Sequence, residues 1–266
     1  MIRAGVLGHP ISHSLSPSIH RAWLDRFGVE GAYEAIDPGP TDDAFGQAIE
    51  RLRADGFAGV NVTAPFKAAA LALADEADEA ARRIGGANTL TFTGGRVRAA
   101  NTDAIGFAAA LAAHGVRPRR ALVLGAGGTA PAVLAALAET DAVFVTNRTD
   151  AKADALAARF GRDAVPWAER EGVPAIDLLV NATTLGVGGT APPPFDLAAL
   201  APGACVADCV YAPGETALVR AARARGLAAF DGLHMLVAQA VPGHRAWFGS
   251  DVPDALVAET VREIRG

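Results

Sequence analysis

The side chains of this sequence that could move a proton lie in short polar segments of its first half. Residues 12–16 read SHSLS, residues 61–67 read NVTAPFK, and GANTL and NTD supply Asn88 and Asp103. Lys67 follows Pro65 in the first turn of a predicted helix, where the helix dipole disfavours a cation by about 0.3–1 kcal/mol. A lysine kept there could serve as a general acid and base. A lysine that only extends into solvent fits the position equally well.

Two other candidates in these segments have simple structural explanations. Asp103 precedes a predicted helix, where an acid is usually an N-cap; it becomes a candidate as the partner that keeps Lys67 charged and oriented. Ser16, before Pro17, is predicted to cap a helix, so Ser14 is the better ligand candidate of the two serines. Because parallel strands present ligands at their carboxyl ends, these loops are expected to converge on one crevice.

A second kind of chemistry is indicated by the glycine loop after residues 122–124. A strand, a glycine-rich turn and a helix start are what pyrophosphate binding requires, since the helix N-terminus supplies free N–H groups. The loop consists of Gly125, Ala126, Gly127, Gly128, Thr129 and Ala130. About 20 residues on, where an NAD enzyme places an acid, stand Asn147, Arg148 and Thr149, with Lys152 nearby. Arg148 could bind a 2′-phosphate, or it could simply be solvated at the end of a strand. With the glycine loop upstream, we favour binding of the 2′-phosphate, which indicates NADP as the cofactor.

The elements that must position these groups alternate along the chain. Strands are predicted at residues 2–7, 32–36 and 57–62, and Gly94-Gly95 forms a hairpin turn. From residue 119 on, strands at 119–124, 142–146, 177–180, 205–206 and 227–230 are separated by helices, which predicts a doubly wound parallel sheet. The fold class is therefore α/β with two domains. Residues 1–103, completed by 238–266, form one domain, residues 104–237 form the other, and the closing helix (253–265) packs back on the first.

Composition excludes several other classes of protein. The 266 residues carry a net charge of −5 with scattered basic residues, which argues against a nucleic-acid binder. No apolar run reaches the roughly 18 residues of a membrane span, and no signal peptide is evident. Cys205 and Cys209 are too far apart along one strand to pair, so a cytoplasmic protein is expected. The histidines form no metal site, and the nucleophile elbow GxSxG is absent.

Nine segments in register make the sequence resemble the shikimate dehydrogenase family over nearly its whole length. They are GHPISHSLSPSIH, GVNVTAPFK, GGANTL, NTDAIGF, LGAGGTA, NRT, VNATTLG, DCVYAPGETAL and DGLHMLVAQA. The resemblance implies a substrate domain followed by a Rossmann-type NADP-binding domain. It also implies an oxidoreductase in the biosynthesis of aromatic amino acids.

The resemblance further implies a role for each matching position. Lys67 and Asp103 correspond to the family's catalytic pair. Substrate binding would fall to Ser14, Ser16, Thr63, Asn88, Tyr211 and Gln239. Cofactor binding would fall to residues 125–130, Asn147, Arg148, Thr149 and Lys152, with Cys209 and Gly232 meeting the nicotinamide through main-chain atoms and Met235 packing near its ring.

The reaction so implied is the reversible, NADPH-dependent reduction of 3-dehydroshikimate to shikimate. Two alternatives stay open: a quinate/shikimate dehydrogenase that uses NAD, and a non-catalytic NADP-binding regulator of the same fold. Arg148 and the serine pair argue against the first, and the pair Lys67–Asp103 argues against the second. The expected partners are small molecules only, with no nucleic acid or membrane, and the expected assembly is a monomer or a homodimer.

Overall fold

The computed structural model describes all 266 residues, and they form two compact units. The first unit comprises Met1–Asp103 and Val237–Thr260, and the second comprises Ala104–Leu236 and Val261–Gly266. Residues 238–266 are all expected in the first domain, whereas Val261–Gly266, at the end of the closing helix, belong to the second unit. No helix combines the length and the apolar character that crossing a bilayer demands.

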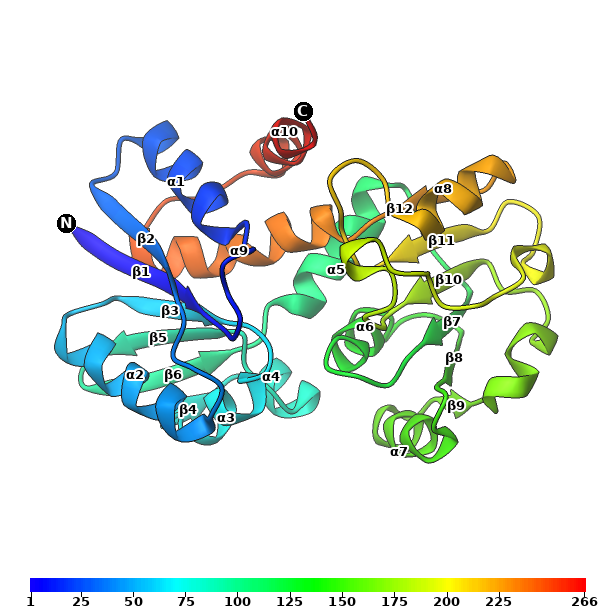
Figure 1. Cartoon of the computed structure of the whole chain (residues 1–266), viewed down its shortest axis with the longest axis horizontal. Coiled ribbons are helices and arrows are strands. Elements are labelled where there is room, and N and C mark those ends of the chain that lie inside the picture. The colour runs from blue at the N-terminus through cyan, green and yellow to red at the C-terminus, as the bar shows by residue number, and fades with distance from the viewer. The chain divides into compact units, whose positions relative to one another are not determined.

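The first unit is built on a six-stranded mixed sheet of order β2-β1-β3-β5-β6-β4 (Figure 1). Its strands are β1 (Ile2–Leu7), β2 (Gly31–Ile36), β3 (Gly59–Val62), β4 (Glu76–Ala77), β5 (Thr89–Thr93) and β6 (Arg96–Ala100). Its helices are α1 (Ser16–Phe27), α2 (Asp42–Ala54), α3 (Lys67–Ala72), α4 (Glu79–Ile84) and most of α9 (Leu233–Phe248) and α10 (Asp254–Arg265). Strands β1, β2 and β3 run parallel, so the loops that follow them meet at one edge.

Helices cover both faces of this sheet (Figure 1). On one face, α2, α3 and α4 pack on the strands through buried side chains such as Phe45, Ala70 and Ala81. On the other, α1 and α9 contribute Leu24 and Trp247. The alternation of side chains along each strand allows both faces to be buried in this way.

Two local predictions for the first unit, the glycine hairpin and the packing of the closing helix, are confirmed, and a threonine caps one of its helices. Gly94 and Gly95, with φ of 58° and 75°, form the hairpin between β5 and β6, because glycine adopts this left-handed conformation without steric cost. Thr41 caps α2 by accepting a hydrogen bond from the amide of Ala44. The closing helix α10 packs on α1, where Trp23 Nε1 donates to Thr260 Oγ1 over 3.0 Å.

The second unit contains the predicted parallel sheet, with order β12-β11-β10-β7-β8-β9 (Figure 1). Its strands are β7 (Arg120–Leu124), β8 (Ala142–Thr146), β9 (Asp163–Ala164), β10 (Leu178–Asn181), β11 (Cys205–Asp208) and β12 (Ala228–Phe230). Its helices are α5 (Asp103–Ala113), α6 (Ala130–Ala136), α7 (Asp150–Phe160) and α8 (Ala217–Ala224), and 3-10 turns occur at Trp167–Gly172, Val187–Gly189 and Leu197–Ala199. All neighbouring strands are parallel.

Alternate residues of β7 show how this sheet is buried on both faces. Ala121 and Val123 face a layer that includes α5, α6 and α7, and Leu122 and Leu124 face a layer that includes α8. A parallel strand covered on both sides needs a continuous apolar run of this kind. The carboxyl ends of β7 and β8 are thereby held rigidly next to each other, which positions the glycine loop and the arginine that follow them.

Candidate active site

Lys67 and Asp103 form a close ion pair in the first unit. The ammonium nitrogen of Lys67 lies 2.5 Å from Oδ2 of Asp103, and the two side chains are 28% and 9% exposed. Each residue begins a helix, Lys67 at the start of α3 and Asp103 at the start of α5. The nearly buried carboxylate thus compensates the unfavourable position of a positive charge at a helix start. The partly exposed ammonium group remains accessible to solvent or to a small ligand.

Backbone contacts explain how two residues so far apart in sequence meet. The carbonyl of Lys67 accepts a hydrogen bond from the amide of Ala87 over 2.8 Å. Asn101 donates to the carbonyl of Gly86 and accepts from the amide of Asp103. A Cβ at position 86 would lie 3.2 Å from that of Lys67, so glycine is what allows the two segments to approach.

Asp103 is therefore not a helix cap, which was the simplest interpretation of its position. The side chain that bonds its amide is that of Asn101. The two oxygens of Asp103 are used by Lys67 and by Asn88, whose Nδ2 lies 2.9 Å from Oδ1. The carboxylate thus holds the ammonium in one orientation.

Asn88 is the centre of this polar cluster. Its Nδ2 lies within hydrogen-bonding distance of Asp103 Oδ1, Thr102 Oγ1 and Gln239 Oε1, at 2.9, 3.0 and 3.1 Å. An amide nitrogen carries only two protons, so three acceptors compete for them. Its Oδ1 accepts from the amide of Thr102 and from Thr89 Oγ1. The arrangement brings Gln239 of α9 to the same cluster as residues 88 and 103.

Asn61 and Tyr33 extend the cluster into the core, and Tyr33 has no counterpart in the sequence analysis. The Tyr33 hydroxyl donates to Asn61 Oδ1 over 2.6 Å, and Asn61 Nδ2 donates to the carbonyl of Asn88 and to Thr89 Oγ1. Burial raises the pKa of Tyr33 well above its usual value, and a hydrogen bond with Ser16 opposes this effect. Tyr33 is therefore a neutral donor, and the period-two pattern of GAYEAI gave no sign of a polar role for it.

The serine loop differs from its prediction in one respect. Ser16 is already the first residue of α1, and its hydroxyl does not cap the helix. Instead, Ser14 Oγ accepts from the amide of Ser16 over 3.3 Å. Ser16 is 5% exposed and Ser14 is half-buried. Neither hydroxyl bonds Lys67 or Asp103 directly. Ser16 is connected to the polar cluster through its hydrogen bond with Tyr33, which donates to Asn61.

Thr63 lies at that edge, directly after β3. Its amide donates to the carbonyl of Leu7 over 2.9 Å, and its methyl group leaves no room for a side chain at Gly8, where a Cβ would lie 2.3 Å away. The loops that begin at residues 8 and 63 therefore pack directly on each other. This contact places Thr63 beside the start of the loop that carries Ser14 and Ser16.

The glycine loop of the second unit has the features that a dinucleotide site needs. Gly125 has a φ of 106°, and its amide donates to the carbonyl of Thr146 at the end of β8. A Cβ on Gly127 or Gly128 would meet no atom within 4 Å, so the loop presents open backbone there. Thr129 precedes α6, whose first residue is Ala130. The amides of Ala130 and Ala132 already donate to the carbonyls of Gly127 and Thr129, and Pro131 has no N–H. The amides that could meet an anion are therefore those of Gly127, Gly128 and Thr129, just before the helix.

The segment after β8 lies next to this loop. Asn147 Oδ1 accepts from the amide of Ala126 over 3.3 Å, which joins the two segments. Arg148, Thr149 and Lys152 are all exposed. Two cations and a hydroxyl beside open backbone amides form a surface suited to phosphate groups.

The ends of β11 and β12 bring two further predicted residues together. The Gly232 amide donates to the carbonyl of Val210 over 3.0 Å, and a Cβ at Gly232 would lie only 2.3 Å from the carbonyl oxygen of Cys209. Met235 is 9% exposed and packs in the core. Tyr211 is 37% exposed, two residues beyond Cys209.

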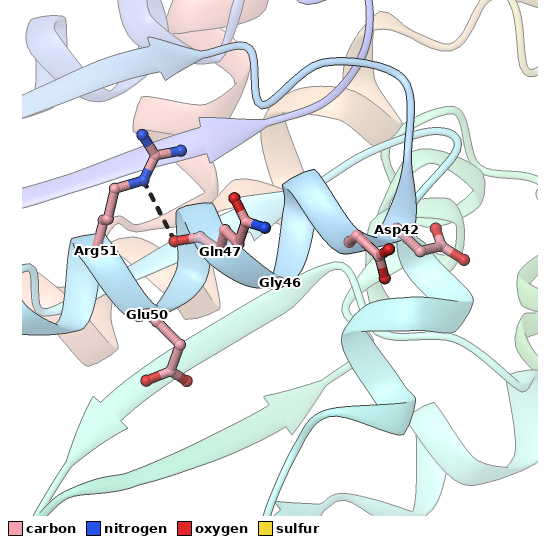
Figure 2. A pocket seen from close by; sticks show the side chains of 6 residues that line it. Asp42, Gly46, Gln47, Glu50 and Arg51 are labelled. Carbon is pink, nitrogen blue, oxygen red and sulfur yellow. Dashed lines mark hydrogen bonds between the residues drawn. The ribbon is translucent and has the colours of Figure 1, made fainter.

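An open hollow of about 670 Å³ along α2 involves none of the predicted site residues (Figure 2). Its lining includes the carboxylates of Asp42, Asp43 and Glu50. Arg51 points its guanidinium back to the carbonyl of Gln47, as Figure 2 shows. Three carboxylates beside one such arginine would repel an anionic substrate, so this hollow has no part in the candidate site.

Sequence reasoning missed several members of these clusters. Thr102 and Tyr33 bond directly to Asn88 or Asn61. Asp208 and Asp231 are buried next to Cys209 and Gly232. In the sequence, Asp208 and Asp231 each immediately precede a residue that is predicted to contact the nicotinamide through its main chain. Thr102 lies in the quoted NTD segment, between Asn101 and Asp103.

Comparison with known proteins shows the family of the chain. Residues 6–90 match the family model described as the shikimate dehydrogenase substrate binding domain, and residues 108–185 match that described as shikimate / quinate 5-dehydrogenase. The shikimate dehydrogenase (NADP(+)) of Acidiphilium cryptum is 49% identical over 99% of this chain and 97% of its own length. That of Methylobacterium radiotolerans is 51% identical over 93% and 91%.

Solved structures agree with this relationship. The crystal structure of shikimate 5-dehydrogenase from Thermus thermophilus in complex with NADP(H) and shikimate superposes with a TM-score of 0.89, at 41% identity over 99% of this chain and 100% of that one. A 5-ketofructose reductase of Gluconobacter has a TM-score of 0.86, at 30% identity over 99% and 98%. With relatives this similar along its whole length, the chain belongs to the shikimate dehydrogenase family.

Proposed function

We propose that the protein is an NADP-dependent shikimate dehydrogenase, which reduces the ring carbonyl of 3-dehydroshikimate to the hydroxyl of shikimate and catalyses the reverse reaction. The observation that carries this proposal is the ion pair of Lys67 and Asp103, 2.5 Å apart and bordered by the amides of Asn88 and Gln239. A proton donor beside polar groups that can bind ring hydroxyls is what reduction of a polyhydroxylated ketone requires.

The residues of the second unit fit the cofactor. Open backbone at Gly127 and Gly128 would receive the pyrophosphate, and Arg148 with Lys152 would hold a 2′-phosphate. Asn147 and Thr149 would hold the ribose, and the main chain of Cys209 and Gly232 would meet the nicotinamide, with Met235 nearby. Bound NADPH supplies a hydride to the carbonyl carbon.

Lys67 supplies the proton that the reaction needs. As negative charge develops on the carbonyl oxygen, Nζ of Lys67 gives its proton to that oxygen and becomes a neutral amine, which recovers a proton from solvent. Asp103 holds the ammonium in place through Oδ2. General acid catalysis of this kind contributes about 10²–10⁴-fold. In the oxidation of shikimate, the neutral lysine accepts the hydroxyl proton.

The remaining predicted residues would bind the substrate. Asn88 and Gln239 supply amide groups for ring hydroxyls, and Ser14, Ser16 and Thr63 supply hydroxyls for the carboxylate, with the phenol of Tyr211. The relatives whose names include shikimate and NADP support this assignment of substrate and cofactor. An acidic chain without a dense basic patch is also consistent with our inference of a cytoplasmic enzyme, monomeric or homodimeric, with small molecules as its partners.

One assay tests the proposal. The appearance of reduced nicotinamide is followed by absorbance with shikimate and NADP, beside NAD, quinate and, in the reductive direction, 5-ketofructose with NADPH. The proposal expects shikimate with NADP to give by far the highest kcat/KM. A preference for quinate with NAD would identify a quinate/shikimate dehydrogenase, and NADP binding without turnover of any substrate would identify a regulator. Either result would refute the proposal.

A further inference from the structure

A buried carboxylate ends β12 and organises the turn that follows it. The side chain of Asp231 is 1% exposed, and its Oδ1 accepts a hydrogen bond from the amide of Leu233, the first residue of α9, over 3.1 Å. A carboxylate that accepts from the first amides of a helix fixes where that helix begins. Asp231 thereby sets the conformation of Gly232, the residue between them.

The penultimate residue of the chain, Arg265, bonds the same carboxylate. Its Nη2 lies 2.6 Å from Asp231 Oδ1, and its Nη1 lies 3.3 Å from the carbonyl oxygen of Gly214. Gly214 belongs to the loop between β11 and α8, which also contains Cys209 and Tyr211. One guanidinium at the end of α10 therefore holds both the turn after β12 and the loop after β11.

A second buried carboxylate makes the charge of Arg265 important. Asp208, at the end of β11, is 1% exposed, and neutral groups hold its Oδ1: Asn181 Nδ2 at 2.8 Å and the amide of Val210 at 3.1 Å. Burial, aided by the negative charge of Asp231, raises the pKa of Asp208. Of the two neighbouring carboxylates, Asp231 is the one that a cation contacts, at Arg265. A buried charge that loses its partner is strongly destabilised.

Movement of the turn at Gly232 would be transmitted directly to Cys209. The Gly232 amide donates to the carbonyl of Val210, and the Cα of Gly232 approaches the Cys209 carbonyl so closely that a Cβ would lie 2.3 Å from its oxygen. Contacts this tight do not permit one segment to shift while the other stays in place.

We propose that Arg265 is a positioning residue for the nicotinamide half of the cofactor site. It touches neither substrate nor cofactor, and it acts through Asp231 on Gly232 and through Gly214 on the loop of Cys209. The inference rests on the proposed function, because Cys209 and Gly232 contact nicotinamide only if the protein uses NADP. The adenosine half, held at residues 125–130 and 147–152, does not depend on Arg265.

The experiment separates the two halves of the cofactor. In R265A we expect the KM for NADP to rise by about tenfold and kcat to fall, on the scale of one lost charge-assisted hydrogen bond. The dissociation constant of adenosine 2′,5′-bisphosphate, which represents the adenosine half alone, should stay within about twofold of the wild-type value. R265K should recover part of the loss. Arg262 is exposed in the same last turn of α10, and R262A is the matched control that should behave as wild type.

A double-mutant cycle identifies the route of the effect. Asn at position 231 can still accept from the amide of Leu233 but carries no charge, so R265A should cost far less in the D231N background than in the wild type. Wild-type kinetics in R265A, or equal weakening of NADP and of the bisphosphate, would overturn the inference. Failure of the wild-type protein to turn over shikimate or to bind the bisphosphate would instead count against the proposed function.

Discussion

Asn88 donates a hydrogen bond to one oxygen of Asp103 at 2.9 Å and leaves the other oxygen to the ammonium of Lys67. The carboxylate is thus fixed by a neutral amide on one side and presents a single acceptor on the other. Because Asn88 is 3% exposed and held by further bonds to Thr102 and Gln239, the orientation of the ion pair is decided by buried groups.

Removing the proposed proton donor should stop catalysis without abolishing binding. K67A is expected to lower kcat by about 10²–10⁴-fold, the usual contribution of general acid catalysis. The dissociation constant of shikimate, measured by calorimetry, should change little. K67R keeps a positive charge but cannot release a proton at neutral pH, so it should be nearly as inactive. Turnover within a few-fold of wild type in either variant would contradict the role of Lys67.

Replacing the partner of Lys67 should also impair turnover. D103N keeps the shape of the side chain, but an amide neither neutralises the ammonium nor accepts as strongly from it. We expect kcat to fall at least about tenfold. Circular dichroism and the melting temperature show whether the fold is retained. If D103N and K67A act through one ion pair, the double variant should be little worse than K67A alone, and strict additivity would exclude that coupling.

Arg148 should determine the choice of cofactor. R148Q removes the guanidinium that could bind a 2′-phosphate bidentately, so the KM for NADP should rise by about 10- to 100-fold. The KM for NAD, which lacks that phosphate, serves as the internal control and should stay nearly constant. Steady-state kinetics with both cofactors measure the ratio. An equal effect on NADP and NAD would assign Arg148 no part in the discrimination.

Two glycines of the same loop should respond differently to alanine. Gly125 has a φ of 106°, and a Cβ there would lie 2.7 Å from the methyl group of Thr183, so G125A should lower the melting temperature. A Cβ at Gly127 would meet nothing within 4 Å, so G127A should fold normally. If the cofactor approaches this open backbone, G127A should still weaken NADP binding. Unchanged affinity in G127A would place the pyrophosphate elsewhere.

A buried histidine pair in the first unit should make stability depend on pH. His20 and His244 are fully buried, and their Nδ1 atoms lie 3.1 Å apart. Burial lowers the pKa of His244 to about 4, and burial together with the neighbouring His244 lowers the pKa of His20 well below its usual value. The unfolded chain therefore binds more protons below about pH 6.5, and the free energy of unfolding should decrease as the pH falls from there toward 4.

H244F tests this dependence. It removes one of the two groups, so the slope of the free energy of unfolding against pH should decrease by about 1.4 kcal/mol per pH unit in that range. Urea denaturation at several pH values gives the slope, and H13Q, which replaces an exposed histidine, is the control. An identical slope in H244F and wild type would show that His244 does not titrate on unfolding.

Much of the architecture follows from local sequence. The apolar runs and the Gly94-Gly95 turn place strands and a hairpin, because buried parallel strands need continuous apolar residues and glycine tolerates positive φ. The nine ordered segments were sufficient to indicate the family. In contrast, the role of Ser16 as a cap was wrong, because Leu15 already has helical φ and ψ of −81° and −10° and Ser16 starts within the helix.

The sequence by itself determined which residue types could carry the chemistry: a lysine at a helix start, an acid before another helix, and an arginine where an NAD enzyme has a carboxylate. Only the tertiary structure decided that the carboxylate of Asp103 bonds Lys67 and Asn88 instead of capping α5, and that Asn88, Thr102 and Gln239 share one buried cluster. These partners are up to 151 positions apart in the chain. Local propensities cannot encode such contacts, because they exist only once packing has brought the segments together.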